Sequence, residues 1–174
     1  MYNKGEIFSA LSDRYQPLLS EEIAGMLGTD RTGFRKTQVS RIRAAAAEFL
    51  KSPIPSLSYH AFSLYDTTGN RVVFENLYFE RRRRLVVFSI TSLLEPENQE
   101  FCDALNETVW AICSEPFWSL PAHFLSENDE PIQFRWYATN LDLFSCETGF
   151  ALAEVLEVNQ EVLAPLVTEQ IRAQ

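Results

Sequence analysis

The sequence is poor in the residues from which several common sites are built. Its 174 residues include six glycines, three cysteines and two histidines. It contains no glycine-rich phosphate loop and no H-E-x-x-H motif, and two histidines without a thiol cluster disfavour a zinc site. We therefore expect no metal ion and no cofactor.

Signals for export or membrane insertion are also missing. No apolar segment follows a basic start at Met1, and no run approaches 18 apolar residues. The three cysteines, Cys102, Cys113 and Cys146, are odd in number and lack C-x-x-C spacing, which predicts reduced, buried thiols. We expect a cytoplasmic protein with no membrane contact.

Positive charge is scarce in the second half of the chain. Residues 1–87 hold 13 Lys+Arg and 9 Asp+Glu, a net +4, and residues 88–174 hold 2 and 15, a net −13, which together give −9. The acidic half argues against nucleic acid as a partner, because phosphate neutralisation supplies most of that affinity. The basic half could still bind a smaller anion.

Apolar residues recur at helical spacing along most of the chain, which predicts an all-α fold. Short links between the segments favour antiparallel helix hairpins within one domain, residues 1–174. We expect helices at about 4–14, 21–28, 30–50, 76–94, 96–113, 142–158 and 160–174, the third having its clearest pattern at 39–50.

Residues 54–76 break this pattern. Leu57, Tyr59 and Ala61 alternate with polar residues, and residues 66–70 carry a turn signal. The segment predicts an irregular loop or a β-hairpin, and we favour the loop.

Trp118 and His123 lie in a turn bracketed by Pro116 and Pro121, which would fix both side chains. An aromatic ring and a histidine suit a uronic-acid site, since one can stack on a sugar and the other can meet a carboxylate. The alternative is a packed core tryptophan and a surface histidine.

Asp142 and Glu147 are five residues apart, about 140° around a helix, so they do not face one glycosidic bond. Asp142 suits a helix N-cap. Glu147 lies on a helix that is apolar on most sides, so we expect it to be buried, either paired with an arginine or lining a cavity.

Four consecutive arginines, residues 81–84, cannot all contact one ligand. Arg81 and Arg84 should share a helix face. Either most of the four are solvated or paired with the acidic half, or some recognise a carboxylate or sulfate by bidentate hydrogen bonds.

Four sequence blocks together carry a resemblance to the heparinase II/III-like polysaccharide lyases. They are residues 78–85 (YFERRRRL), 108–115 (TVWAICSE), 118–123 (WSLPAH) and 142–149 (DLFSCETG). The resemblance implies the N-terminal part of an incomplete α/α toroid, in an enzyme that cleaves acidic polysaccharide by β-elimination.

It also implies that the catalytic residues lie in a C-terminal remainder, so we expect this chain to be inactive alone. Its own substrate-binding candidates are Trp118, His123, Glu147 and Arg84. Two alternatives remain: an α/α-barrel glycoside hydrolase of unsaturated uronides, and a non-catalytic carbohydrate-binding module.

Overall fold

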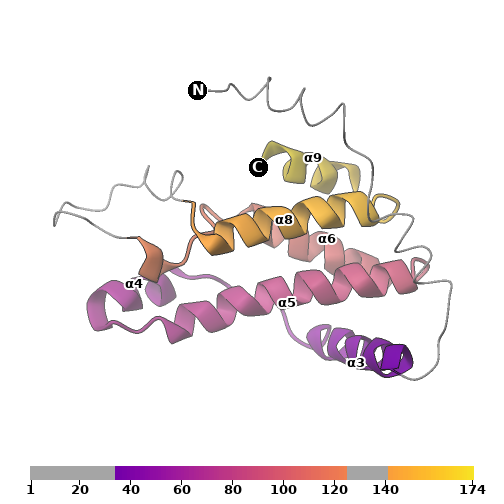
Figure 1. Cartoon of the computed structure of the whole chain (residues 1–174), viewed down its shortest axis with the longest axis horizontal. Helices are drawn as coiled ribbons and strands as arrows, with labels where there is room; N and C mark the ends of the chain where they lie inside the picture. The colour runs from indigo at the N-terminus through magenta and orange to yellow at the C-terminus, as the bar shows by residue number, and fades with distance from the viewer. Residues whose placement is uncertain (1–33, 125–140) are drawn as a thin grey trace. The chain divides into compact units, whose positions relative to one another are not determined.

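The computed structural model describes residues 34–124 and 141–174 (Figure 1). The described elements are α3 (Phe34–Phe49), α4 (Tyr59–Thr68), α5 (Val72–Leu94), α6 (Gln99–Cys113), the 3₁₀ helix η1 (Pro121–His123), α8 (Leu143–Val158) and α9 (Pro165–Ala173). With no strand in these ranges, the all-α prediction is confirmed. They fall in one compact unit, Thr32–Gln174. The helices expected at 4–14 and 21–28 lie outside the described residues, so a single domain over 1–174 stays a prediction.

The prediction of a loop or hairpin at residues 54–76 is wrong. Residues 59–68 form helix α4 and residues 72–76 are the first turn of α5, so that only 54–58 and 69–71 lie outside helices. Ser58 caps α4 by accepting a hydrogen bond from Ala61 N–H, and Gly69, at φ 73°, ends the helix in a left-handed conformation. The turn signal at 66–70 was therefore a helix C-terminus.

Helices α5 and α6 form an antiparallel hairpin. Arg81 in the middle of α5 donates to the carbonyl of Ala111 near the end of α6, 3.1 Å away. Helix α3 is also antiparallel to α5, because Arg43 pairs with Glu95 while Phe49 O accepts from Arg84. These pairings fit the predicted antiparallel arrangement.

The second hairpin, α8–α9, lies beside the first with the same chain direction. Tyr78 bonds Thr148 and Ser89 bonds Asn159, each pair 70 residues apart, so α5 and α8 run parallel, as Figure 1 shows. The side chain of Asn106 bonds Val162 O and Ala164 N, and Gln174 bonds Cys113 O, so α6 and α9 also run parallel.

The main core forms where these helices meet. Its buried side chains come from α3, α5, α6, α8, α9 and the turn before α9, and include Leu85, Phe88, Leu105 and Leu152. Helix α8 is less buried than its composition predicted, because Phe150 is 66% exposed. Among the described helices, none is long and apolar enough to cross a membrane.

Truncating the core should destabilise the chain far more than truncating its surface. Leu105 is fully buried, so Leu105→Ala should lower the free energy of unfolding by about 2–5 kcal/mol. Leu166, 66% exposed on α9, gives the matched control, and Leu166→Ala should change it by less than about 0.5 kcal/mol. Urea denaturation measures both; equal losses would contradict the assigned packing.

Candidate functional site

The turn that carries Trp118 and His123 follows α6 and ends in η1, whose first residue is Pro121. Trp118 is half-buried: its ring packs against the main core, and its Nε1–H donates to Ile112 O at 3.0 Å. His123 keeps 32% of its side chain exposed and stacks on Phe144, with ring centroids 5.5 Å apart. The two rings therefore pack on different neighbours, and His123 is the more accessible.

Asp142 holds this turn and caps α8, which confirms the predicted N-cap. Its Oδ1 accepts from Ser145 N–H at 2.7 Å, and its Oδ2 lies 2.6 Å from His123 Nδ1 and 3.2 Å from Leu120 N. Burial by itself raises the pKa of Asp142. The hydrogen bonds from Ser145, His123 and Leu120 outweigh burial and hold the pKa below its ordinary value of 3.8. Asp142 is thus an anion at neutral pH, and His123 Nδ1 donates to it.

Tyr78 of α5 fastens the turn from the other side. Its hydroxyl donates to Trp118 O at 2.9 Å and lies 3.1 Å from Thr148 Oγ1. The guanidinium of Arg82 lies 3.6 Å from the centre of the Tyr78 ring, a cation–π contact, and its Nε donates to Thr148. Burial raises the pKa of Tyr78, partly offset by Arg82, so the phenol stays protonated.

Glu115, two residues after the end of α6, pairs with two arginines. Arg82 binds it through two parallel hydrogen bonds, 2.7 Å and 2.6 Å, and Arg81 adds a third of 2.9 Å. Only 3% of the Glu115 side chain is exposed. Arg81 and Arg82, not Arg81 and Arg84, therefore act together, and the prediction that arginines pair with the acidic half is confirmed for these two.

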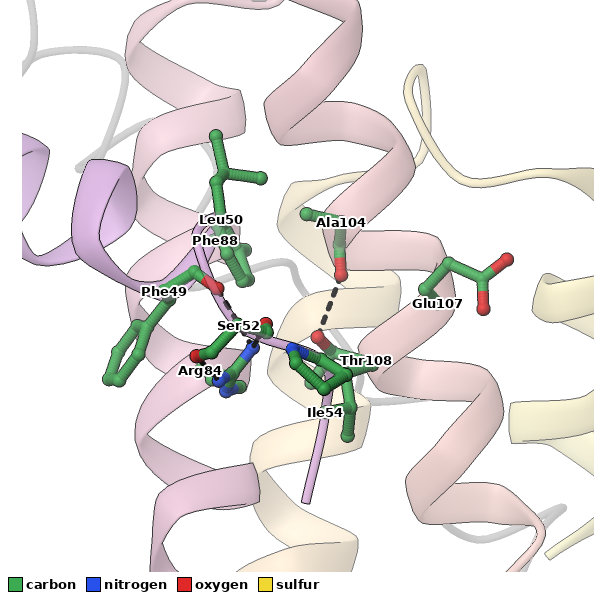
Figure 2. Close-up of a pocket in the computed structure, with 10 residues that line it drawn as sticks. Phe49, Leu50, Ser52, Ile54, Arg84, Phe88, Ala104, Glu107 and Thr108 are labelled. Carbon is green, nitrogen blue, oxygen red and sulfur yellow. Dashed lines mark hydrogen bonds between the residues drawn. The ribbon is translucent and has the colours of Figure 1, made fainter. Parts of the chain in front are cut away.

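Arg84 has a structural role instead of the predicted substrate contact. It is 2% exposed, and its five N–H donors are all used, by Glu80, Phe49 O and both oxygens of Ser52. It lines a cavity of about 340 Å³, and Figure 2 shows its guanidinium directed at Ser52, with the Glu107 carboxylate turned away. No donor of Arg84 is left for a ligand.

Glu147 is exposed on α8 and makes no ion pair with the described residues, so the prediction that it is buried is wrong. The helix turns Ser145 and Thr148 inward and Glu147 outward. Cys146 is exposed as well, whereas Cys102 and Cys113 are buried as expected. Burial, then the Glu115 carboxylate, raises the pKa of Cys113 to about 11.

The sequence interpretation missed Tyr78, Arg82 and Glu115 as site residues. Tyr78 and Arg82 are four apart on one helix, a spacing that would have revealed their contact. Glu115 gave no comparable signal, because its partners lie 33 and 34 residues away.

The four sequence blocks meet in this network. Tyr78 links the first block to the third and fourth, and Arg82 links it to the second. His123 then joins the third block to the fourth through Asp142. Residues 34–124 and 141–174 contain no group of three potential metal ligands. No family model matches the chain, and no curated protein matches its sequence.

Removing the Glu115 charge should leave two arginines uncompensated. Glu115→Gln should lower the free energy of unfolding by about 3 kcal/mol, the low end for a broken buried ion pair, because Arg81 and Arg82 keep 12% and 15% exposure. Glu107→Gln, an exposed position on α6, should cost less than about 0.5 kcal/mol. A similar loss in both variants, by urea denaturation, would refute the network's role.

Replacing Asp142 with asparagine should make stability less sensitive to acid. Since the folded pKa is lowered, the stabilisation from ionised Asp142 is complete well above the unfolded pKa of 3.8 and is lost as pH falls through the folded value. Asp142→Asn should therefore be less stable than wild type at pH 7, and this difference in stability should shrink as the pH falls below 3.8 and through the lower folded-state pKa. Unfolding curves across this range test it, with exposed Asp66→Asn as control. A gap that stays constant with pH would contradict the assignment.

Proposed function

We propose that this chain is the helical, substrate-binding part of a lyase that cleaves acidic, uronate-containing polysaccharide. The observation that supports it best is the convergence of the four blocks that resemble the heparinase II/III-like lyases. Hydrogen bonds join them across separations of 19 to 70 residues. When four blocks that resemble one family are joined in one hydrogen-bond network, a shared site explains them better than four unrelated resemblances do.

The stacking of the hairpins supports the toroid part of the proposal. In an α/α toroid, successive hairpins lie side by side, so each inner helix runs parallel to the next inner helix and each outer helix to the next outer one. The pairs α5 with α8 and α6 with α9 have this relation. We infer that α5 and α8 belong to one layer and α6 and α9 to the other.

His123 is the residue we assign to the substrate. The anionic Asp142 accepts from Nδ1 and so fixes both the tautomer and the ring orientation. With Nδ1 donating to Asp142, Nε2 carries a proton only in the imidazolium, and that cation would donate to a uronate carboxylate. Neutralising that carboxylate is one requirement of β-elimination, because it stabilises the carbanion-like charge that develops at C5.

The second requirement is a base that removes the C5 proton, and we assign it to no described residue. Trp118 shapes the turn, and Glu147 stays a peripheral candidate for substrate contact because it is exposed on α8. We place the protein in the cytoplasm, which its free thiols favour.

A non-catalytic carbohydrate-binding module is the second candidate. The observation that favours it is that the carboxylates of Asp142 and Glu115 are both fully engaged in hydrogen bonds. The same observation disfavours the glycoside hydrolase, which needs two carboxylates facing one bond. Formation of unsaturated uronate, followed by its ultraviolet absorbance, separates a lyase from a binding module.

The first test is selective binding of a uronate oligosaccharide. The chain should bind it at least about tenfold more tightly than the same saccharide with its carboxylates reduced to alcohols, or about 1.4 kcal/mol. His123→Ala should remove that preference. His123→Asn is the matched variant, since its amide can still donate to Asp142 but lacks Nε2.

Calorimetric titration gives the affinities, and thermal unfolding gives the control. His123→Asn should keep most of the stability that His123→Ala loses, while both lose the preference for the carboxylate. If His123→Asn binds as wild type does, His123 belongs to the scaffold and the proposal fails at this residue.

A further inference from the structure

A second cavity lies where the segment before α4, α4 itself, α5 and the end of α6 meet. Its volume is about 560 Å³, within the range of small-molecule sites. Pro116 and Phe117, which directly precede the turn of the candidate site, form part of its wall, whereas neither Trp118 nor His123 lines it. The cavity is thus adjacent to the His123 turn but separate from it.

Aromatic side chains build its floor and its rim. Phe62 packs against Phe74 and Phe117, with ring centroids 5.6 Å and 5.2 Å apart, so the floor is preformed. Tyr59 and Trp110 also line the cavity, yet Tyr59 is 83% exposed and Trp110 42%. Exposed rings on the wall of a cavity offer flat faces on which a ligand ring can stack.

The charged groups of the cavity wall belong to an arginine–glutamate cluster, whose second arginine, Arg82, does not line the cavity. Arg81 and Glu115 are the charged groups among its described lining residues. Glu115 shares its single negative charge between Arg81 and Arg82, so the cluster carries one net positive charge. Arg81 uses Nε on Pro55 O and Nη1 on Ala111 O and Glu115, and its Nη2 makes no hydrogen bond to the described residues.

Hydroxyl groups complete the lining. Ser56, Ser58 and Ser114 line the same cavity and are exposed. Ser58 Oγ accepts from Ala61 N–H as the α4 cap, which leaves its own proton for donation. Ring faces, hydroxyls and the two N–H donors of Arg81 Nη2 together match a sugar that bears a carboxylate. A hydrophobic peptide would leave the hydroxyls and the charge unmatched.

We propose that this cavity binds one uronate unit, with its carboxylate on Arg81 Nη2 and its ring against Tyr59 and Trp110. The identity of the sugar rests on the proposed function, since a uronate polymer that reaches His123 would place a neighbouring unit here. The proposal deepens that function by adding a second saccharide subsite, next to the first, to the same chain.

The experiment titrates the 174-residue chain with a glucuronate-containing tetrasaccharide and with its carboxyl-reduced form. Tyr59→Ala and Trp110→Ala should each weaken binding of the native tetrasaccharide at least about tenfold. Phe150→Ala is the matched control, because Phe150 is an exposed aromatic on α8 outside the cavity. The affinity of this variant for the native tetrasaccharide should stay within about twofold of wild type. Thermal unfolding of each variant checks that the fold is intact.

The outcomes separate this inference from the proposed function. If Tyr59→Ala and Trp110→Ala bind as wild type does while His123→Asn loses the carboxylate preference, the cavity is not a subsite and the proposed function stands. If the cavity variants lose affinity and His123→Asn does not, the subsite stands and the role of His123 fails. Equal binding of the native and reduced tetrasaccharides, or no binding of either, overturns both.

Discussion

One buried carboxylate, that of Glu115, organises the part of the fold that carries the site. A carboxylate with 3% exposure is stable only where its charge is compensated, and two guanidinium groups supply that compensation. Because Arg81 and Arg82 are adjacent on α5 and Glu115 lies two residues after α6, the ion cluster joins the two helices at the C-terminal end of α6. Arg82 extends the constraint to α8 through Thr148. The relative positions of α5, α6 and α8 thus depend on the negative charge of Glu115.

Asp142 also has more than one structural role, because its two carboxylate oxygens bind different partners. One caps α8 through Ser145, and the other holds His123 and the backbone of Leu120. A helix cap needed for folding therefore also orients the imidazole that we assign to the substrate. Tyr78 closes the assembly, since its hydroxyl reaches the turn and α8 together. In the proposed lyase, positioning of the substrate and stability of the scaffold are properties of one network.

The sequence predicted what depends on local pattern. Helical periodicity gave the all-α class, and Asp142 was recognised as a cap because capping involves neighbours in the chain. Helix α4 was missed because alternating apolar residues before a turn signal imitate a hairpin, although Ser58 and Gly69 are ordinary helix caps. Glu147, the acid expected to be buried, is exposed, whereas Glu115, which the sequence analysis did not single out, is buried. Which acid pairs with the arginines depends on tertiary contacts between residues more than 30 positions apart. Local sequence patterns do not reveal such contacts.

The account's central claim is that the His123 turn and the adjacent aromatic cavity form one surface for a uronate saccharide. Amide chemical-shift mapping of the chain, with a uronate oligosaccharide and then with its carboxyl-reduced form, tests this claim most directly. The account predicts that the native saccharide shifts amides of residues 117–123 and 111–115 together, and that the reduced form shifts them far less. Shifts that fall instead on α3 and α9, or that are the same for both saccharides, would contradict it.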